Sequence, residues 1–279
     1  MTARLLPPMA EDEYHALPAF SQSIATTLVT RSPLHAYLQH PAHGGRGKRS
    51  SKAMDLGTLG HALVLGKGRK IRVIDAKDWR TDAAKDKRDD AKAAGEIPVL
   101  AVDYDEAVTM AGSVLATLDE MGIALDGVSE QGIEWDEETA LHGPLWCRGM
   151  FDHLRIHAGQ IVDLKFTADA SSPRIERSAI DHGYDIQRAA YVSALEKLRP
   201  ELMGRVDFLF LFVETEPPHI VNPVRADGAF RELGERRWRR AVNEWASCVA
   251  ANHWPGYAPA GINNITAPPW AVAREDYGA

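Results

Sequence analysis

Two acidic residues and a lysine near the middle of the chain have the types and spacing of a metal-dependent active site. Residues 161–166 are rich in apolar and β-branched side chains, which favours a strand. Side chains two apart on a strand share a face, so Asp163 and Lys165 would project together while Leu164 points into a core. The alternative is a surface strand whose Asp163 and Lys165 pair in solvent, which contributes little to stability.

A second carboxylate, Asp152, belongs to a predicted bent strand or strand pair over residues 145–156. The turn at 157–160 can fold this segment back as a hairpin, which brings Asp152 near Asp163. Two carboxylates and the backbone carbonyl of Leu164 form a hard-oxygen site suited to Mg²⁺. The neighbouring lysine would orient a water or offset charge on a phosphate oxygen.

Two predicted helices and one strand could add to this site. Residues 55–65 read as a helix on which small glycines and His61 lie together, so His61 could reach a metal or a phosphate, although a lone helical histidine is commonly a packing residue. Residues 184–198 are predicted to form a helix on which Gln187 and Tyr191 are neighbours, so both could border the metal site; the alternative is a polar pair at a helix surface. A strand at 128–135 carries two glutamates, of which Glu130 is a secondary candidate ligand and Glu134 could also approach.

These features together resemble a known family. Asp152 followed by Asp163-Leu164-Lys165 resembles the PD-(D/E)XK nuclease signature. The segment from Gln187 to Tyr191 is similar to the Q-x-x-x-Y motif of its RecB-like and RecE-like branches, which implies that these two residues hold a DNA phosphate or terminal base. The histidine helix, with Gly57-Thr58-Leu59-Gly60-His61, is also similar to those branches. The segments around Tyr14 and 254–257 resemble the two ends of RecE-type (exonuclease VIII) phage and prophage nucleases, so the resemblance covers nearly the whole chain.

The resemblance implies an α/β fold with a PD-(D/E)XK (restriction-endonuclease-like) core: a central mixed sheet flanked by helices, with helical additions at both ends. It implies a metal-dependent exonuclease that degrades linear double-stranded DNA from its ends, 5′ to 3′, with Mg²⁺ as cofactor and Mn²⁺ as a substitute. It also implies a homo-oligomeric ring and a single-strand annealing protein as partner. Two alternatives stay open: a RecB-like nuclease of other polarity, and an inactive DNA-binding or oligomerisation module of the same fold.

Length and composition are those of a globular protein. The 279 residues suffice for one elaborated domain over 1–279, with the nuclease core at about 55–215 and a C-terminal helix and tail at 229–279. Apolar residues make up 45% and charged residues 25%, and neither a long apolar run nor a signal peptide is present, so we expect a cytoplasmic protein without membrane contact. Cys147 and Cys248 are far apart, which predicts reduced thiols and no structural zinc.

The formal net charge of −7 confines any DNA binding to a local basic patch. Three clusters are candidates: one in the Gly-rich loop at 46–52, one at 67–72 and one at 236–240. Each could equally be a solvated face. The apolar, proline-broken segment 261–279 must bury its side chains on its own subunit or on a neighbour, which favours a symmetric homo-oligomer.

Overall fold

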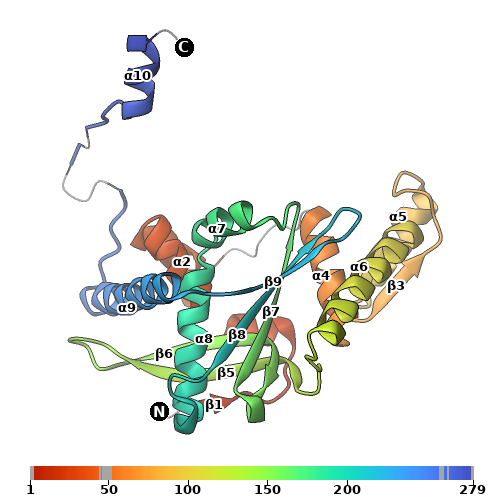
Figure 1. Cartoon of the computed structure of the whole chain (residues 1–279), viewed down its shortest axis with the longest axis horizontal. Coiled ribbons are helices and arrows are strands. Elements are labelled where there is room, and N and C mark those ends of the chain that lie inside the picture. Colours follow the sequence, from red (N-terminus) through yellow and green to blue (C-terminus); the bar gives the residue numbers. More distant parts are fainter. Residues whose placement is uncertain (1–2, 44, 46–51, 258–260, 263, 278–279) are drawn as a thin grey trace.

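The fold is described from a computed structural model, which defines residues 3–43, 45, 52–257, 261–262 and 264–277 (Figure 1). The strands of its main sheet are β1 (Arg4–Leu5), β2 (Phe20–Ser21), β5 (Val128–Glu138), β6 (Pro144–Arg155), β7 (Gln160–Thr167), β8 (Asp207–Glu214) and β9 (Val221–Arg225). Six of them follow the order β1-β5-β6-β7-β8-β9, and β2 pairs with β6. The pairs β7–β8 and β2–β6 are parallel and the others antiparallel, so the predicted mixed sheet is confirmed.

Helices cover both faces of this sheet. Those that pack on it are α2 (Gln22–Thr30), α4 (Lys52–Leu65), α6 (Ala101–Glu120), α8 (Tyr184–Leu198) and α9 (Gly228–Ala251). The chain also forms α1 (Glu11–Ala16), α3 (Pro33–Gln39), α7 (Ser172–Asp181) and α10 (Pro269–Tyr277), the last of which lies away from the sheet (Figure 1). One core lies between the sheet and α2, α8 and α9. A second core lies between the sheet and α4 and α6.

Strand β8 is apolar throughout because both of its faces are buried. Phe208, Phe210 and Phe212 belong to the core under α8 and α9, whereas the alternate residues Leu209 and Leu211 belong to the core under α4 and α6. A strand buried on both faces cannot alternate apolar with polar residues. Full burial of each such side chain contributes about 1.5–3 kcal/mol.

A separate arm projects from the sheet between α4 and α6. It consists of β3 (Ile71–Ile74), α5 (Asp82–Ala93) and β4 (Ile97–Leu100), and the two strands pair in parallel as a small second sheet (Figure 1). Thr81 caps α5, because its Oγ1 accepts a hydrogen bond from Ala84 N at 3.3 Å.

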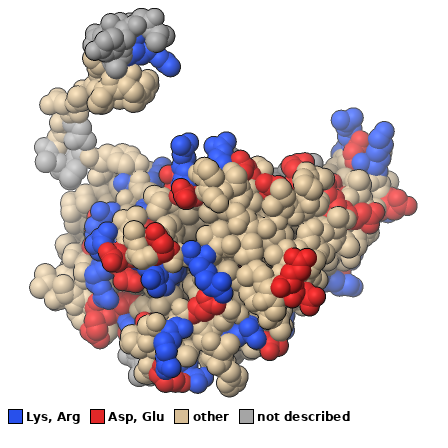
Figure 2. Space-filling view, in the orientation of Figure 1, with Lys and Arg blue, Asp and Glu red and all other residues tan. Residues whose placement is uncertain are grey.

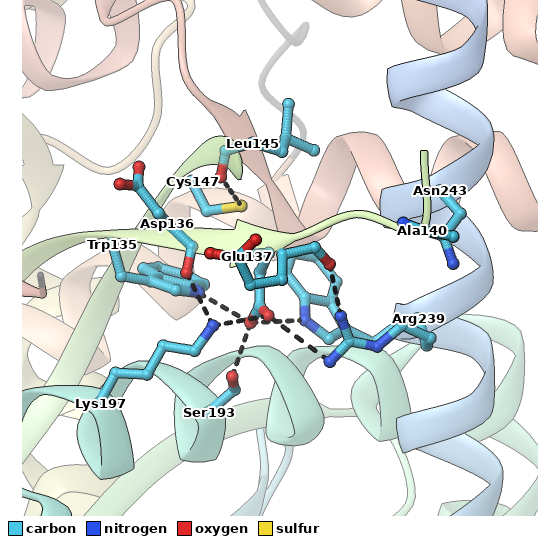
Figure 3. Close-up of polar contacts among 12 residues, drawn as sticks. Trp135, Asp136, Glu137, Ala140, Leu145, Cys147, Ser193, Lys197, Arg239 and Asn243 are labelled. Atoms are coloured by element: carbon cyan, nitrogen blue, oxygen red, sulfur yellow. Dashed lines mark hydrogen bonds and ion pairs between the residues drawn. The ribbon is translucent and has the colours of Figure 1, made fainter. Parts of the chain in front are cut away.

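A buried glutamate joins the sheet to α8 and α9 (Figure 3). Glu137 is fully buried, and its carboxylate accepts hydrogen bonds from Ser193 Oγ at 2.6 Å, Lys197 Nζ at 2.7 Å and the indole nitrogens of Trp135 and Trp238 at 2.9 and 3.1 Å. Burial alone would raise the pKa of Glu137, but the hydrogen bonds from Lys197, Ser193 and Trp135 lower it. This network fixes α8 on the end of β5.

Other expectations for local structure have mixed outcomes. Helix α4 begins at Lys52, three residues before the predicted start, so part of the expected loop is helical. The rest of the basic part of that loop, 46–51, lies outside the described residues. Ser21 precedes α2 and Ser171 precedes α7, but neither side chain accepts a capping hydrogen bond. Both cysteines are free thiols, as expected.

The C-terminal segment leaves the body of the molecule after α9 (Figure 1). The exposed fractions of Ile262, Ile265 and Trp270 are 98%, 100% and 68%. Burial of this segment on its own subunit, one of the two predicted outcomes, is therefore wrong for these three side chains. No helix in the described parts of the chain is long and apolar enough to cross a membrane.

Candidate active site

Asp152 lies where strands β6 and β7 separate. The two strands pair from Arg155↔Gln160 to His153↔Val162, and the next residue of β6, Asp152, has no partner in this ladder. Its side chain closes the gap, because Asp152 Oδ2 accepts a hydrogen bond from Leu164 N at 2.8 Å. The hairpin predicted from the sequence thus brings Asp152 against the β7 backbone beside Asp163.

Asp163 and Lys165 share the face of β7 that α8 covers. Asp163 is fully buried, its Oδ2 accepts a hydrogen bond from Gln187 Nε2 at 2.7 Å, and its Oδ1 forms an ion pair with Lys165 Nζ. Lys165 Nζ also lies 4.7 Å from the centre of the Tyr184 ring. Leu164 points into the opposite core, as its position in the strand predicts. The alternative of a solvent-exposed Asp163–Lys165 pair is wrong.

Burial dominates the protonation of both carboxylates. Removal from water raises the pKa of Asp163 to about 6, although Lys165 opposes the shift. Burial likewise raises the pKa of Asp152, against the charge of Lys165 and the hydrogen bond from Leu164. Burial would lower the pKa of Lys165, but Asp163 and Asp152 together raise it, so the lysine stays charged. The site therefore holds two carboxyl groups whose negative charge is poorly solvated and attracts cations.

His61 reaches the site from α4. Its Nδ1 lies 3.8 Å from Asp152 Oδ2, and its ring meets the edge of Phe166 with centroids 5.3 Å apart. Burial and the charge of Lys165 lower the pKa of His61 to about 4, while a hydrogen bond with the Leu164 backbone acts in the opposite direction. His61 is consequently neutral at pH 7, the form in which imidazole can bind a metal.

The two glutamates of β5 have different environments. Glu130 has a φ of +50°, which is rare for a residue with a side chain, and it occupies the place opposite Asp152 where the β5–β6 ladder is interrupted. Burial raises the pKa of Glu130, and its charge interacts with His61 and Asp152. Glu134 is buried elsewhere and pairs with Arg4, so the expectation that it could approach the site is wrong.

Gln187 and Tyr191 are on one face of α8 but have different surroundings. Gln187 holds the Asp163 carboxylate, whereas the Tyr191 hydroxyl accepts a hydrogen bond from Met150 N at 3.4 Å. The Tyr191 ring lies on Gly149, where a Cβ atom would be only 2.8 Å from it. Tyr191 is only 5% exposed, so in this structure it supports β6 below the site.

Sequence patterns did not indicate Arg148, which lies four residues before Asp152 on β6. It is only 5% exposed, its guanidinium is 4.6 Å from the centre of the Tyr14 ring, and its Nε has no hydrogen-bond partner among the described residues. The Arg148 backbone pairs with Ser21, directly before α2. The sequence does contain a signal for Arg148, namely an arginine within the otherwise buried strand β6. Such a buried charge requires a partner and therefore indicates a special role.

The donor atoms fit a divalent cation. Asp163 Oδ1 is buried without a hydrogen-bond partner among the described residues, and the second carboxylate, Asp152, adjoins it. Among the described residues, no three His, Cys, Asp or Glu side chains surround one point closely enough to hold an ion. Mg²⁺ is suited to this arrangement, because it is usually bound by one or two carboxylates, with waters and phosphate completing its shell.

The mixed sheet with helices on both faces and this group of polar residues define a PD-(D/E)XK, nuclease-like fold. The chain belongs to the family described as PDDEXK-like domain of unknown function (DUF3799), whose model matches residues 27–264. No curated protein matches the chain.

Two solved structures are similar to it. A protein from Eubacterium rectale, named provisionally as an exonuclease, is 13% identical with a TM-score of 0.59, and the match covers 98% of this chain and 100% of that one. A phage-related exonuclease from Haemophilus somnus is 9% identical with a TM-score of 0.32, over 87% of this chain and 99% of that one. The first likeness supports the fold.

Proposed function

We propose that this chain is a Mg²⁺-dependent exodeoxyribonuclease that hydrolyses linear double-stranded DNA from its ends, in the 5′ to 3′ direction. The observation that carries the proposal is the position of Asp152 and Lys165 around the buried, incompletely satisfied carboxylate of Asp163. A cation and a phosphate would complete this group. The resemblance of its motifs to RecE-type nucleases supports the substrate and the polarity.

The ion would be held by Asp152, Asp163 and the Leu164 carbonyl, with His61 in support and Glu130 as a secondary candidate. When bound, it would polarise a phosphoryl oxygen and favour a nucleophilic water. Gln187 holds Oδ2 of Asp163, and Oδ1, which pairs with Lys165, would be the atom that turns to the ion when the ion binds. The charge of Lys165 would stabilise the extra negative charge that develops on the phosphate.

Arg148 and Tyr191 complete the proposed site with different roles. The positive charge of Arg148, beside the start of α2, would attract a phosphate near the end of the DNA strand. In place of the predicted contact with DNA, Tyr191 would position the β6 backbone that carries both Arg148 and Asp152.

The test is digestion of a linear duplex labelled at either the 5′ or the 3′ end, with Mg²⁺, Mn²⁺ or EDTA. We expect digestion with either metal and none with EDTA, and loss of activity in Asp163→Ala and Lys165→Ala. The exposed Asp181→Ala is a matched control that should keep wild-type activity. Digestion by Asp163→Ala at the wild-type rate would refute the site, and a folded wild type that binds DNA without cleaving it would favour the inactive module. Release of the 3′ label first would indicate the RecB-like polarity.

Metal binding can be measured apart from activity. Calorimetric titration of Asp152→Asn with Mg²⁺ should show weaker binding than wild type, because one carboxylate charge is lost while the side-chain shape is kept. An unchanged titration would remove Asp152 from the metal ligands.

We further propose that the chain forms a homo-oligomeric ring and acts with a single-strand annealing protein in DNA recombination. The exposed Ile262, Ile265 and Trp270 support association, because such side chains are normally buried against another surface. Light scattering of the intact protein at micromolar concentration should give a multiple of the 30.7 kDa chain mass. A monomer under these conditions would refute the ring.

A further inference from the structure

The position of cationic side chains distinguishes between the three clusters that could contact DNA. Residues 46–51 lie outside the described residues. Two arginines of the α9 cluster are engaged with buried carboxylates: Arg237 pairs with Asp185, and Arg239 pairs with Glu137 and the Glu138 carbonyl. Arg236 pairs only with the exposed Glu232. The contacts with buried carboxylates give Arg237 and Arg239 structural roles.

The projecting arm has a charge opposite to that of the rest of the chain. Residues 67–100 contain ten Lys and Arg against seven Asp and Glu, whereas the remaining residues contain 22 against 32. The arm therefore has a net charge of +3 and the remainder −10. Figures 1 and 2 show the arm extending from the body, with both blue and red side chains at its outer end. In an acidic protein, such a segment is the place where a polyanion is attracted.

Three exposed cations lie at the base of this arm. We define the arm-base patch as Lys67, Arg69 and Lys70, which directly follow α4, the helix that carries His61. All three are exposed; the side chains of Arg69 and Lys70 are 54% and 82% accessible.

Electrostatic interactions link the arm-base patch to the site. Lys67 interacts electrostatically with Glu130, and Glu130 interacts in the same way with Asp152 and His61. Arg69 lies 3.9 Å from Glu11, too far for a hydrogen bond, so a phosphate could replace this partner at little cost.

We infer that the duplex part of a DNA substrate lies across the arm-base patch, which binds backbone phosphates as the strand end enters between β6 and β7. The inference rests on the proposed function and adds the direction from which the duplex approaches. The site then separates two regions of the substrate: the strand end towards Arg148 and α2, and the uncleaved duplex towards α4 and β3. Phosphate contacts of this kind position a duplex without reading its sequence, as an exonuclease requires.

The test is the salt dependence of binding to a blunt duplex in EDTA, followed by fluorescence anisotropy between 50 and 200 mM KCl. The variant combines Lys67→Gln, Arg69→Gln and Lys70→Gln, and the control combines Arg231→Gln, Arg236→Gln and Arg240→Gln on α9, which removes the same charge. Three lost phosphate contacts reduce the slope of log K against log salt by about 2.7. Over this salt range wild type should lose about 40-fold more affinity than the arm-base variant.

The outcomes separate this inference from the proposed function. If wild type binds and digests DNA but the arm-base variant keeps the wild-type slope, or the α9 control loses as much, the inference is overturned and the proposed function stands. If wild type neither binds nor digests DNA, the proposed function fails and the inference with it. Thermal unfolding of each variant confirms that it is folded, and all the substituted side chains are exposed.

Discussion

Replacement of Gly234 by alanine should separate α8 from α9. Gly234 is buried in α9, and a Cβ atom there would lie 2.2 Å from the carbonyl oxygen of Asp185, 2.7 Å from its carbon and 3.2 Å from its Cα. All three are backbone atoms of α8, so no side-chain rotation relieves the contact and the helices must move apart by about 1 Å to reach normal van der Waals distances. The Arg237–Asp185 ion pair, with N–O distances of 2.8 and 2.9 Å, lies at the same crossing.

The expected loss of stability follows from two opposing effects. Overpacking against rigid backbone costs about 3–4 kcal/mol, at and above the upper end of the usual range, while alanine in place of glycine inside a helix returns about 1 kcal/mol. We expect Gly234→Ala to lower the free energy of unfolding by about 2–3 kcal/mol and the Tm by roughly 5–10 °C. Because α8 also carries Gln187, the variant should hydrolyse DNA more slowly even below its Tm.

The measurement is thermal and urea unfolding beside Gly112→Ala, a matched control in α6. No heavy atom lies within 4 Å of a Cβ atom added to Gly112, so this variant should gain about 1 kcal/mol from helix propensity alone. Equal stability of the two variants would contradict the close approach of α8 and α9.

Three further changes test other parts of the structure. Gly60→Ala, whose Cβ atom would meet Phe166 Cζ, should reduce hydrolysis about tenfold by displacing the neighbours of His61, whereas Gly57→Ala, with 3.7 Å to Phe166, should stay near the wild-type rate. Burial lowers the pKa of His40 to about 4, so below about pH 6.5 the imidazole takes up a proton in the unfolded chain but not in the folded chain. The free energy of unfolding should therefore be about 2 kcal/mol smaller at pH 5 than above pH 6.5. His40→Gln should remove this part of the pH dependence of urea unfolding. Glu137→Gln should cost about 2–3 kcal/mol by removing the charge that Lys197 and two indoles share, and thermal unfolding as stable as wild type would show that the network contributes nothing.

Local sequence patterns were sufficient for the elements that carry the site. The period of two in residues 161–166 puts Asp163 and Lys165 on one face of β7, and the spacing in 184–198 puts Gln187 one turn before Tyr191; both follow from backbone geometry alone. The apolar run of β8 likewise indicated a strand buried on both faces. The fold class could be expected because these elements occur in the order of a known nuclease core.

Pairing between distant segments decided the rest. Strands β1 and β2 are two residues long and are defined only by their pairing with β5 and β6, so no local sequence pattern predicts them. The distinction between Glu130 and Glu134, both on β5, depends on what lies across from each residue.

The sequence by itself determined which residues could share a face, and with them the chemistry of two carboxylates and a lysine. Only the tertiary structure decided that Arg148 is buried without a full set of partners, that Tyr191 supports β6, and that Lys67 interacts with Glu130. The physical reason is that burial and charge partners come from residues remote in sequence, while periodicity reports only on neighbours along the chain.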